Sequence, residues 1–226
     1  MQHQLWGFPL AYYFVLLSIV LYRIPVIGKF FNIINTILHE LGHALTALLL
    51  EGKVHKIEIF HDTSGVTVTQ CKSKIGTIAT SLNGYIFAST SAFVCFHLLT
   101  LGLYEALIIA LSLLFFIVMI LLIRNPYGWL WVLCFCGLNG FLVYHGEESY
   151  LEIAALFYAT TILTESVFSP FIVLYLSFAH SEAAGDATNL QKFTHVPAAV
   201  WALLFCAYAI FIAYQIYINF FSTFAS

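Results

Sequence analysis

The feature that most constrains the fold of this chain is a series of long apolar segments separated by short polar stretches. A helix needs about 20 apolar residues to cross the hydrocarbon core of a bilayer, and only helices and closed barrels satisfy their backbone there. The sequence therefore predicts an all-α polytopic membrane protein with about seven transmembrane helices. The predicted spans are approximately 6–22, 30–50, 78–101, 106–123, 128–144, 153–178 and 198–221.

The composition agrees with a membrane protein and excludes several other classes. Only 8% of the residues are charged and 62% are hydrophobic, whereas about a quarter of a soluble domain is charged. A net charge of -3 provides no basic surface, so we expect no nucleic-acid partner. Five scattered cysteines do not suggest a disulfide framework. We expect residues 1–226 to form a single transmembrane domain in contact with the lipid bilayer, and nothing in the sequence indicates an oligomeric state.

Lysine and arginine are unequally distributed between the two sets of connecting segments. Only Arg23 and Lys29 lie between the first and second spans. The connections after the second, fourth and sixth spans carry Lys53, Lys56, Lys72, Lys74, Arg124 and Lys192. Short loops rich in these residues stay in the cytoplasm, so we expect these three connections, and with them the amino terminus, to be cytoplasmic. The absence of a recognisable targeting peptide suggests the plasma (inner) membrane of a bacterium.

One stretch departs from the helical pattern. Residues 54–60 (VHKIEIF) and 66–71 (VTVTQC) are rich in β-branched residues and flank the turn-forming residues 61–65. This pattern predicts a small cytoplasmic β-hairpin, an insert at about 53–72 directly after the second span. Two roles are open: a plain surface hairpin, or a strand edge that pairs with an extended peptide.

The second span contains the pattern HExxH, formed by His39, Glu40 and His43. Two histidines four residues apart share one face of a helix, so both imidazoles can reach one metal ion. In this pattern zinc lowers the pKa of its water to about 7, and the glutamate removes the proton without binding the ion. A shuffled chain of this composition would contain roughly 0.014 matches. Ionisable groups inside a span usually mark function.

A catalytic zinc ion takes three protein ligands and keeps a fourth position open, so a further ligand is needed. Asp62 lies in the predicted hairpin turn, where a polar residue needs no other reason. Glu165 lies inside the sixth span, and Asp186 lies between the sixth and seventh spans, on the side where the second span ends. Asp186 also follows a glycine, which is typical of a helix N-cap. The residues alone leave the third ligand open.

A different class of protein is also compatible with these residues. A non-catalytic membrane metal-binding or metal-transport protein could use the same histidines and an acid. A transporter is expected to line a path through several spans with polar residues, but the first, fourth and fifth spans have few. Metal binding alone gives no reason for Glu40.

Several stretches together resemble the M50B-like membrane metallopeptidases, which are relatives of the site-2 proteases. The resemblance begins with residues 39–45 (HELGHAL), continues through 51–54 (EGKV) and 64–66 (SGV), and returns at 186–190 (DATNL) and 194–197 (THVP). It therefore extends over most of the chain.

The resemblance implies an intramembrane zinc metalloprotease that hydrolyses peptide bonds of membrane-associated protein substrates. It implies that one Zn²⁺ is bound by His39, His43 and Asp186, and that Glu40 is the general base that activates water.

Overall fold

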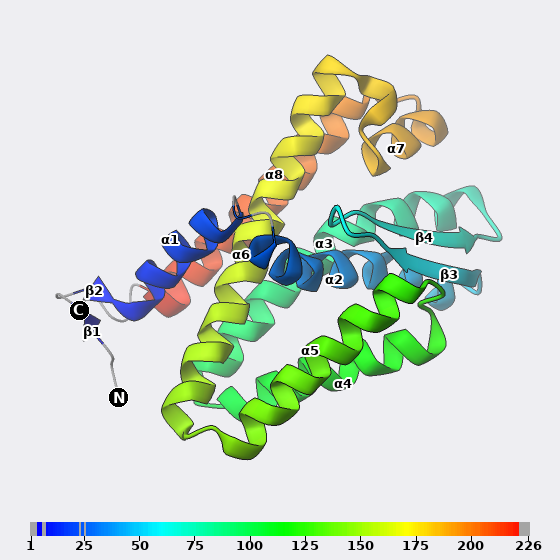
Figure 1. Ribbon diagram of the computed structural model, residues 1–226. Helices are drawn as coiled ribbons and strands as arrows, with labels where there is room; N and C mark the ends of the chain where they lie inside the picture. The colour runs from blue at the N-terminus through cyan, green and yellow to red at the C-terminus, as the bar shows by residue number, and fades with distance from the viewer. Residues whose placement is uncertain (1–3, 6–7, 23, 25, 222–226) are drawn as a thin grey trace.

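The computed structural model describes residues 4–5, 8–22, 24 and 26–221, most of which are helical (Figure 1). A short pair of strands, β1 (Gln4–Leu5) and β2 (Phe8–Pro9), precedes the helices, and the 3₁₀ turn η1 (Ser181–Ala183) and the π-helical turn η2 (Tyr217–Phe221) come late in the chain. The other elements are α1 (Leu10–Tyr22), α2 (Ile27–Leu49), β3 (Lys53–Ile59), β4 (Gly65–Gln70), α3 (Lys74–Thr100), α4 (Tyr104–Leu121), α5 (Pro126–His145), α6 (Glu148–Ala179), α7 (Asp186–Thr194) and α8 (Ala198–Ile216).

Five helical segments in the described residues are long and apolar enough to cross a membrane. They are α3, α4, α5, α6 and α8 continued by η2, and they correspond to the third to seventh predicted spans. Helix α2 has 23 residues, but its polar side chains lower its mean hydropathy. Helix α1 has 13 residues, and residues 6 and 7 of the first predicted span lie outside the described residues. The total of seven therefore stays a prediction.

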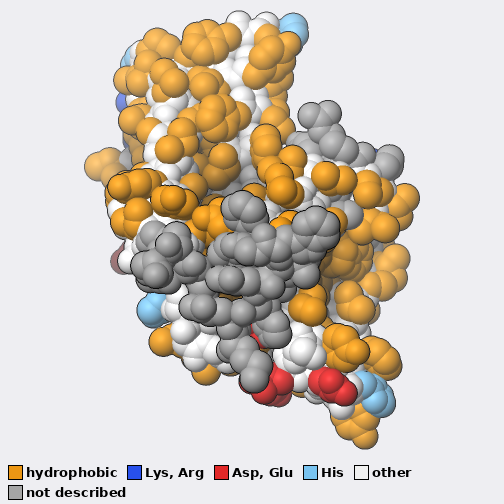
Figure 2. Space-filling model, turned by 90° about the vertical axis from the view of Figure 1, so that its left-hand side faces the viewer, with side chains coloured by type: hydrophobic (Ala, Val, Ile, Leu, Met, Phe, Trp, Pro, Cys, Tyr) orange, Lys and Arg blue, Asp and Glu red, His pale blue; other side chains and the backbone are white. Residues whose placement is uncertain are grey.

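The outer surface of the helices is largely apolar, as an integral membrane protein requires. Large side chains such as Leu113 on α4, Leu130 on α5 and Phe171 on α6 are exposed. In the face drawn in Figure 2, most of the described side chains are hydrophobic, and acidic side chains are visible near the lower end. Together with the five apolar helices, this surface identifies an integral membrane protein.

Helix α2 packs most closely against α3. Its buried apolar residues, including Ile33, Ile37 and Leu41, recur every four positions and enter the main core. The close approach depends on Gly42, because a Cβ there would lie 2.6 Å from the backbone oxygen of Asn83. The Asn83 side chain crosses between the helices and donates hydrogen bonds to the Gly42 oxygen (3.2 Å) and the Thr46 hydroxyl (2.6 Å).

Strands β3 and β4 form the antiparallel hairpin expected after α2, within one residue of the predicted strands. The outer edge of β3 is already paired. Ile57 donates from its backbone to Leu122 (2.8 Å) and accepts from Arg124 (3.0 Å), while the Asn125 side chain donates to the Ile59 oxygen and accepts from its N–H. In the described residues, the outer edge of β4 has no such backbone partner.

Candidate metal centre

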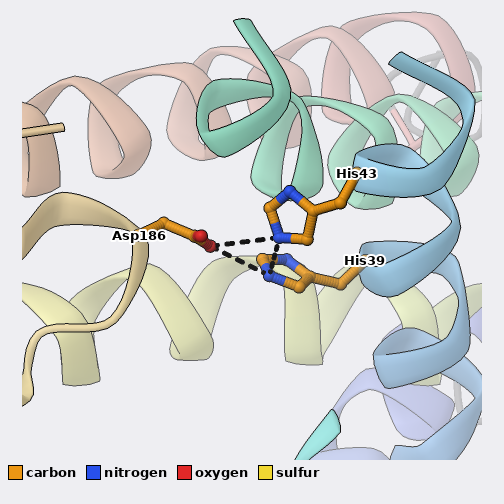
Figure 3. Close-up of side chains that lie close together, drawn as sticks. All are labelled: His39, His43 and Asp186. Carbon is orange, nitrogen blue, oxygen red and sulfur yellow. Dashed lines mark hydrogen bonds and ion pairs between the residues drawn. The ribbon is translucent and has the colours of Figure 1, made fainter. Parts of the chain in front are cut away.

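The two histidines of the HExxH pattern lie on one face of α2, with their rings pointing in the same direction (Figure 3). The Nε2 atoms of His39 and His43 are 3.0 Å apart. The other ring nitrogen of His43, Nδ1, lies 2.6 Å from the backbone oxygen of Thr80 on α3. A carbonyl oxygen can only accept, so this Nδ1 carries the proton and Nε2 presents a lone pair.

Aromatic side chains position the His39 ring. Tyr85 of α3 meets it edge-on, with ring centroids 4.5 Å apart, and Phe205 of α8 stacks on Tyr85 at 4.4 Å. Both aromatic side chains are buried. His39 is therefore supported by packing and His43 by a hydrogen bond, and the two rings have little freedom to separate.

Asp186 is the first residue of α7, and its carboxylate points at both rings (Figure 3). Its Oδ2 lies 3.2 Å from Nε2 of His39 and 3.2 Å from Nε2 of His43. The N-cap alternative for this residue is wrong: Gly185 occupies the cap position, and there is no side-chain cap hydrogen bond. Gly185 has a φ of 53°, a conformation that glycine adopts readily.

Helix α7 is held in place by a small core of its own. Ala187 and Leu190 are fully buried and pack in a cluster that includes Tyr85 and Phe205, the residues that support His39. The carboxylate from α7 and the imidazole from α2 are therefore positioned by one shared set of apolar contacts.

The three ligand atoms fit a small divalent cation. In a tetrahedral zinc site, ligand atoms at about 2.0–2.1 Å from the ion are about 3.3 Å from one another. The separations among His39, His43 and Asp186 are 3.0–3.2 Å. Two imidazole nitrogens and a carboxylate oxygen are also the donors that zinc prefers. Among the described residues, these three form a group of potential metal ligands lying within 4.8 Å of one another.

Gly84 of α3 provides the space in which the two rings lie. A Cβ at this position would be 2.6 Å from Cε1 of His39 and 2.6 Å from both Cε1 and Nε2 of His43. Any side chain larger than hydrogen would displace the ligand rings. The sequence pattern gave no signal for this role, because Gly84 lies 41 residues after His43 in a different helix.

The other two acids that the sequence left open do not reach the rings. Asp62 lies in the hairpin turn, where its carboxylate accepts hydrogen bonds from the N–H (3.1 Å) and hydroxyl (2.6 Å) of Ser64. These bonds lower the pKa of Asp62 below its usual value. Glu165 of α6 is buried in the wall of a neighbouring cavity and is not part of the ligand group.

Glu40 follows His39 on α2, and its side chain contacts the hairpin. Its Oε2 accepts a hydrogen bond of 2.6 Å from the hydroxyl of Thr67 on β4, which also lies 3.1 Å from the Glu40 backbone oxygen. Gly65 packs directly against the carboxyl group, since a Cβ there would lie 2.8 Å from Oε1. Sequence reasoning missed Thr67, although the alternation in β4 predicts that it shares a face with Thr69.

A polar cavity of about 260 Å³ opens beside His39 and Glu40. Its walls come from α2, the hairpin turn, α3 and α6, and it supplies room for water and a small bound group next to the candidate ligands. The lining residues are Asn35, Thr36, His39, Glu40, Thr63, Ser64, Gly65, Tyr85, Glu165, Ser169 and Ile172.

A membrane-embedded helical bundle with an HExxH helix and a converging carboxylate has the architecture of a membrane metallopeptidase. Comparison with protein families agrees: the description Peptidase M50B-like matches residues 11–216. The chain belongs to this family of peptidases. Searches of curated proteins and of solved structures give no match.

Proposed function

We propose that this protein is a zinc-dependent intramembrane metalloprotease that hydrolyses peptide bonds of membrane-associated protein substrates. The observation that carries the proposal is the convergence of His39, His43 and Asp186, with Glu40 alongside. Membership of the M50B-like family supports it. A protein that only bound a metal ion would need the three ligands but would have no need for Glu40. Peptide hydrolysis does need a carboxylate beside the ion, and Thr67 holds Glu40 there.

In this proposal, each residue of the centre has a distinct role. His39, His43 and Asp186 hold one zinc ion, which supplies a Lewis acid for the scissile carbonyl and acidifies water. Glu40 takes a proton from the attacking water and passes it to the leaving amine. The Thr67 hydroxyl donates to Oε2 of Glu40 and so fixes the carboxylate, while Oε1 accepts no hydrogen bond from the described residues and is available for that proton.

We also propose that the hairpin holds the substrate as an added strand. A transmembrane helix keeps its carbonyl groups hydrogen-bonded internally, so the substrate must unwind before it can be attacked. The outer edge of β4 has no backbone partner among the described residues, and the same strand contacts Glu40 through Thr67. A peptide paired with β4 would therefore run beside the proposed base.

The membrane and the orientation are part of the proposal. We propose the plasma membrane of a bacterium, with the amino terminus and the hairpin in the cytoplasm, because most lysines and arginines lie in the connections on that side. An Asp62→Cys variant, compared with the parent chain, should react with an impermeant maleimide in inverted vesicles and not in intact cells. The reverse labelling pattern would refute this orientation.

The test of the activity compares cells that produce the wild type with cells that produce Glu40→Gln. Membranes from wild-type cells should contain new protein amino termini within or beside transmembrane segments, and the variant should not generate them. Both purified proteins should bind one zinc ion per chain, because Glu40 is not a ligand. Zinc binding with identical amino termini in the two samples would refute the peptidase and favour a non-catalytic metal-binding protein.

A further inference from the structure

Two hydrogen-bond acceptors in the cavity have no part in the proposed chemistry. Asn35 of α2 and Glu165 of α6 both line the cavity that contains His39 and Glu40. They are well buried, with 7% of Asn35 and 9% of Glu165 exposed. Both side chains therefore lie largely out of contact with the membrane and face the space in which a substrate would bind.

Neither acceptor is satisfied within the described part of the chain. Oδ1 of Asn35 is buried without a hydrogen-bond partner, and the carboxyl group of Glu165 has no hydrogen bond or ion pair with the residues described. Most buried polar groups in proteins are paired, and an unpaired one costs free energy. Inside a membrane protein an unpaired acidic group is expected to meet a donor, and the described residues supply none here, which leaves water or a bound group to provide it.

The position of the pair places this donor close to the reacting bond. Asn35 precedes His39 by four residues on α2, so the two side chains lie on the same face one turn apart. Glu165 approaches from α6 across the same cavity. A group bound between them would therefore lie in the same cavity as His39 and Glu40, beside the candidate metal centre.

Charge identifies the kind of donor. The cavity lining contains no lysine or arginine. A divalent ion at the metal centre would offset the charges of Asp186 and Glu40, whereas the lining holds no counter-charge for Glu165, so burial favours its neutral form until a cation binds beside it. A protonated amine suits both side chains, because it balances an ionised carboxylate and has three N–H donors to share between the two acceptors.

We propose that Asn35 and Glu165 form an amine-binding subsite that takes a lysine-type side chain of the substrate next to the scissile bond. The Glu165 carboxylate pairs with the ammonium group, and Oδ1 of Asn35 accepts one of its N–H groups. This inference rests on the proposed peptidase function, since it specifies which substrate sequence that function prefers.

The experiment measures binding to the zinc-loaded Glu40→Gln protein in detergent, so that no cleavage interferes. The probes are pairs of fluorescein-labelled apolar decapeptides. The two peptides of a pair differ at one of the six central positions, which carries lysine in one peptide and norleucine in the other. Fluorescence anisotropy should show that lysine lowers the Kd by about tenfold at one position. Adding Glu165→Gln should abolish this preference, and adding Asn35→Ala should reduce it.

The matched control is Glu105→Gln in the same Glu40→Gln background, which removes the same charge from an exposed position on α4. It should keep the full preference for lysine. Glu165→Asp, which keeps the charge on a shorter side chain, should keep part of it and so distinguishes loss of the carboxylate from loss of folding. Zinc content should be the same in all variants, because neither Asn35 nor Glu165 is a proposed ligand.

Equal Kd values for every lysine and norleucine pair would overturn the subsite, and so would a preference that survives Glu165→Gln. Failure of the peptidase proposal gives a different result: the wild type would leave the bound peptides uncut while the lysine preference persisted. The two proposals can therefore fail independently.

Discussion

Replacing Gly84 with alanine tests whether the two histidine rings act together as metal ligands. The added Cβ would lie 2.6 Å from atoms of both rings, well inside van der Waals contact. The rings cannot simply turn away. His43 is hydrogen-bonded through Nδ1 to Thr80, and His39 is packed against Tyr85. The substitution must therefore push Nε2 of at least one ring away from the common point.

Two effects of opposite sign determine the magnitude. Alanine is favoured over glycine inside a helix by about 1 kcal/mol, which stabilises α3. Overpacking a tight contact costs about 1–3 kcal/mol, and disturbing the groups that orient a metal ligand typically lowers metal affinity about 10–100-fold. Folding stability should therefore change little, whereas zinc affinity should fall by about 10–100-fold, which is about 1.4–2.7 kcal/mol.

Zinc affinity can be measured by competition with a chromophoric chelator on the purified protein in detergent. The matched control is Gly137→Ala on α5, where the added Cβ has nothing within 4 Å and the gain in helix propensity is the same. That variant should bind zinc like the wild type. Equal affinities for the Gly84→Ala and Gly137→Ala proteins would refute the placement of the rings against α3.

Three further substitutions probe the remaining contacts. Thr67→Val removes the hydroxyl that holds Glu40 and should lower kcat/KM by about 10–100-fold with zinc content unchanged, whereas Thr67→Ser should retain most activity. Asp186→Asn should weaken zinc binding, measured by the same competition, by more than about 100-fold, because losing a ligand costs more than losing a group that orients one. Asn125→Ala removes two hydrogen bonds to Ile59, worth about 2 kcal/mol together, and should speed amide hydrogen exchange in β3 by about 30-fold. Unchanged exchange would show that Asn125 does not hold β3 in place.

The sequence predicts the part of the site that depends on one helix. His39, Glu40 and His43 lie within a single turn and a half of α2, so their relative positions follow from helical geometry once the helix forms. Asp186 is 143 residues after His43, and its position depends on the packing of α7 against other helices. Its approach to the rings therefore required the structure, although the family resemblance pointed to it.

Residues that support the site could not be found from the sequence for the same reason. Gly84 and Thr67 act on side chains that come from other elements, so a local pattern cannot tell which side chain either one contacts. The number of transmembrane helices is hard to predict for a related reason. The polar residues of the HExxH pattern also lower the mean hydropathy of α2, so this helix is not among the five that are apolar enough to cross a membrane.

The contacts of the hairpin explain how a short insert can position the carboxylate of Glu40, the proposed base. Strand β3 is tied to the connection between α4 and α5 through Ile57 and Asn125, and strand β4 is tied to α2 through the bond from Thr67 to Glu40. A two-stranded hairpin alone is only marginally stable, so these two attachments hold it in place. Within the described part of the chain, the edge that lacks a backbone partner belongs to β4. A substrate strand added there, as we propose, would therefore be aligned with Glu40 by the same strand that holds its carboxylate.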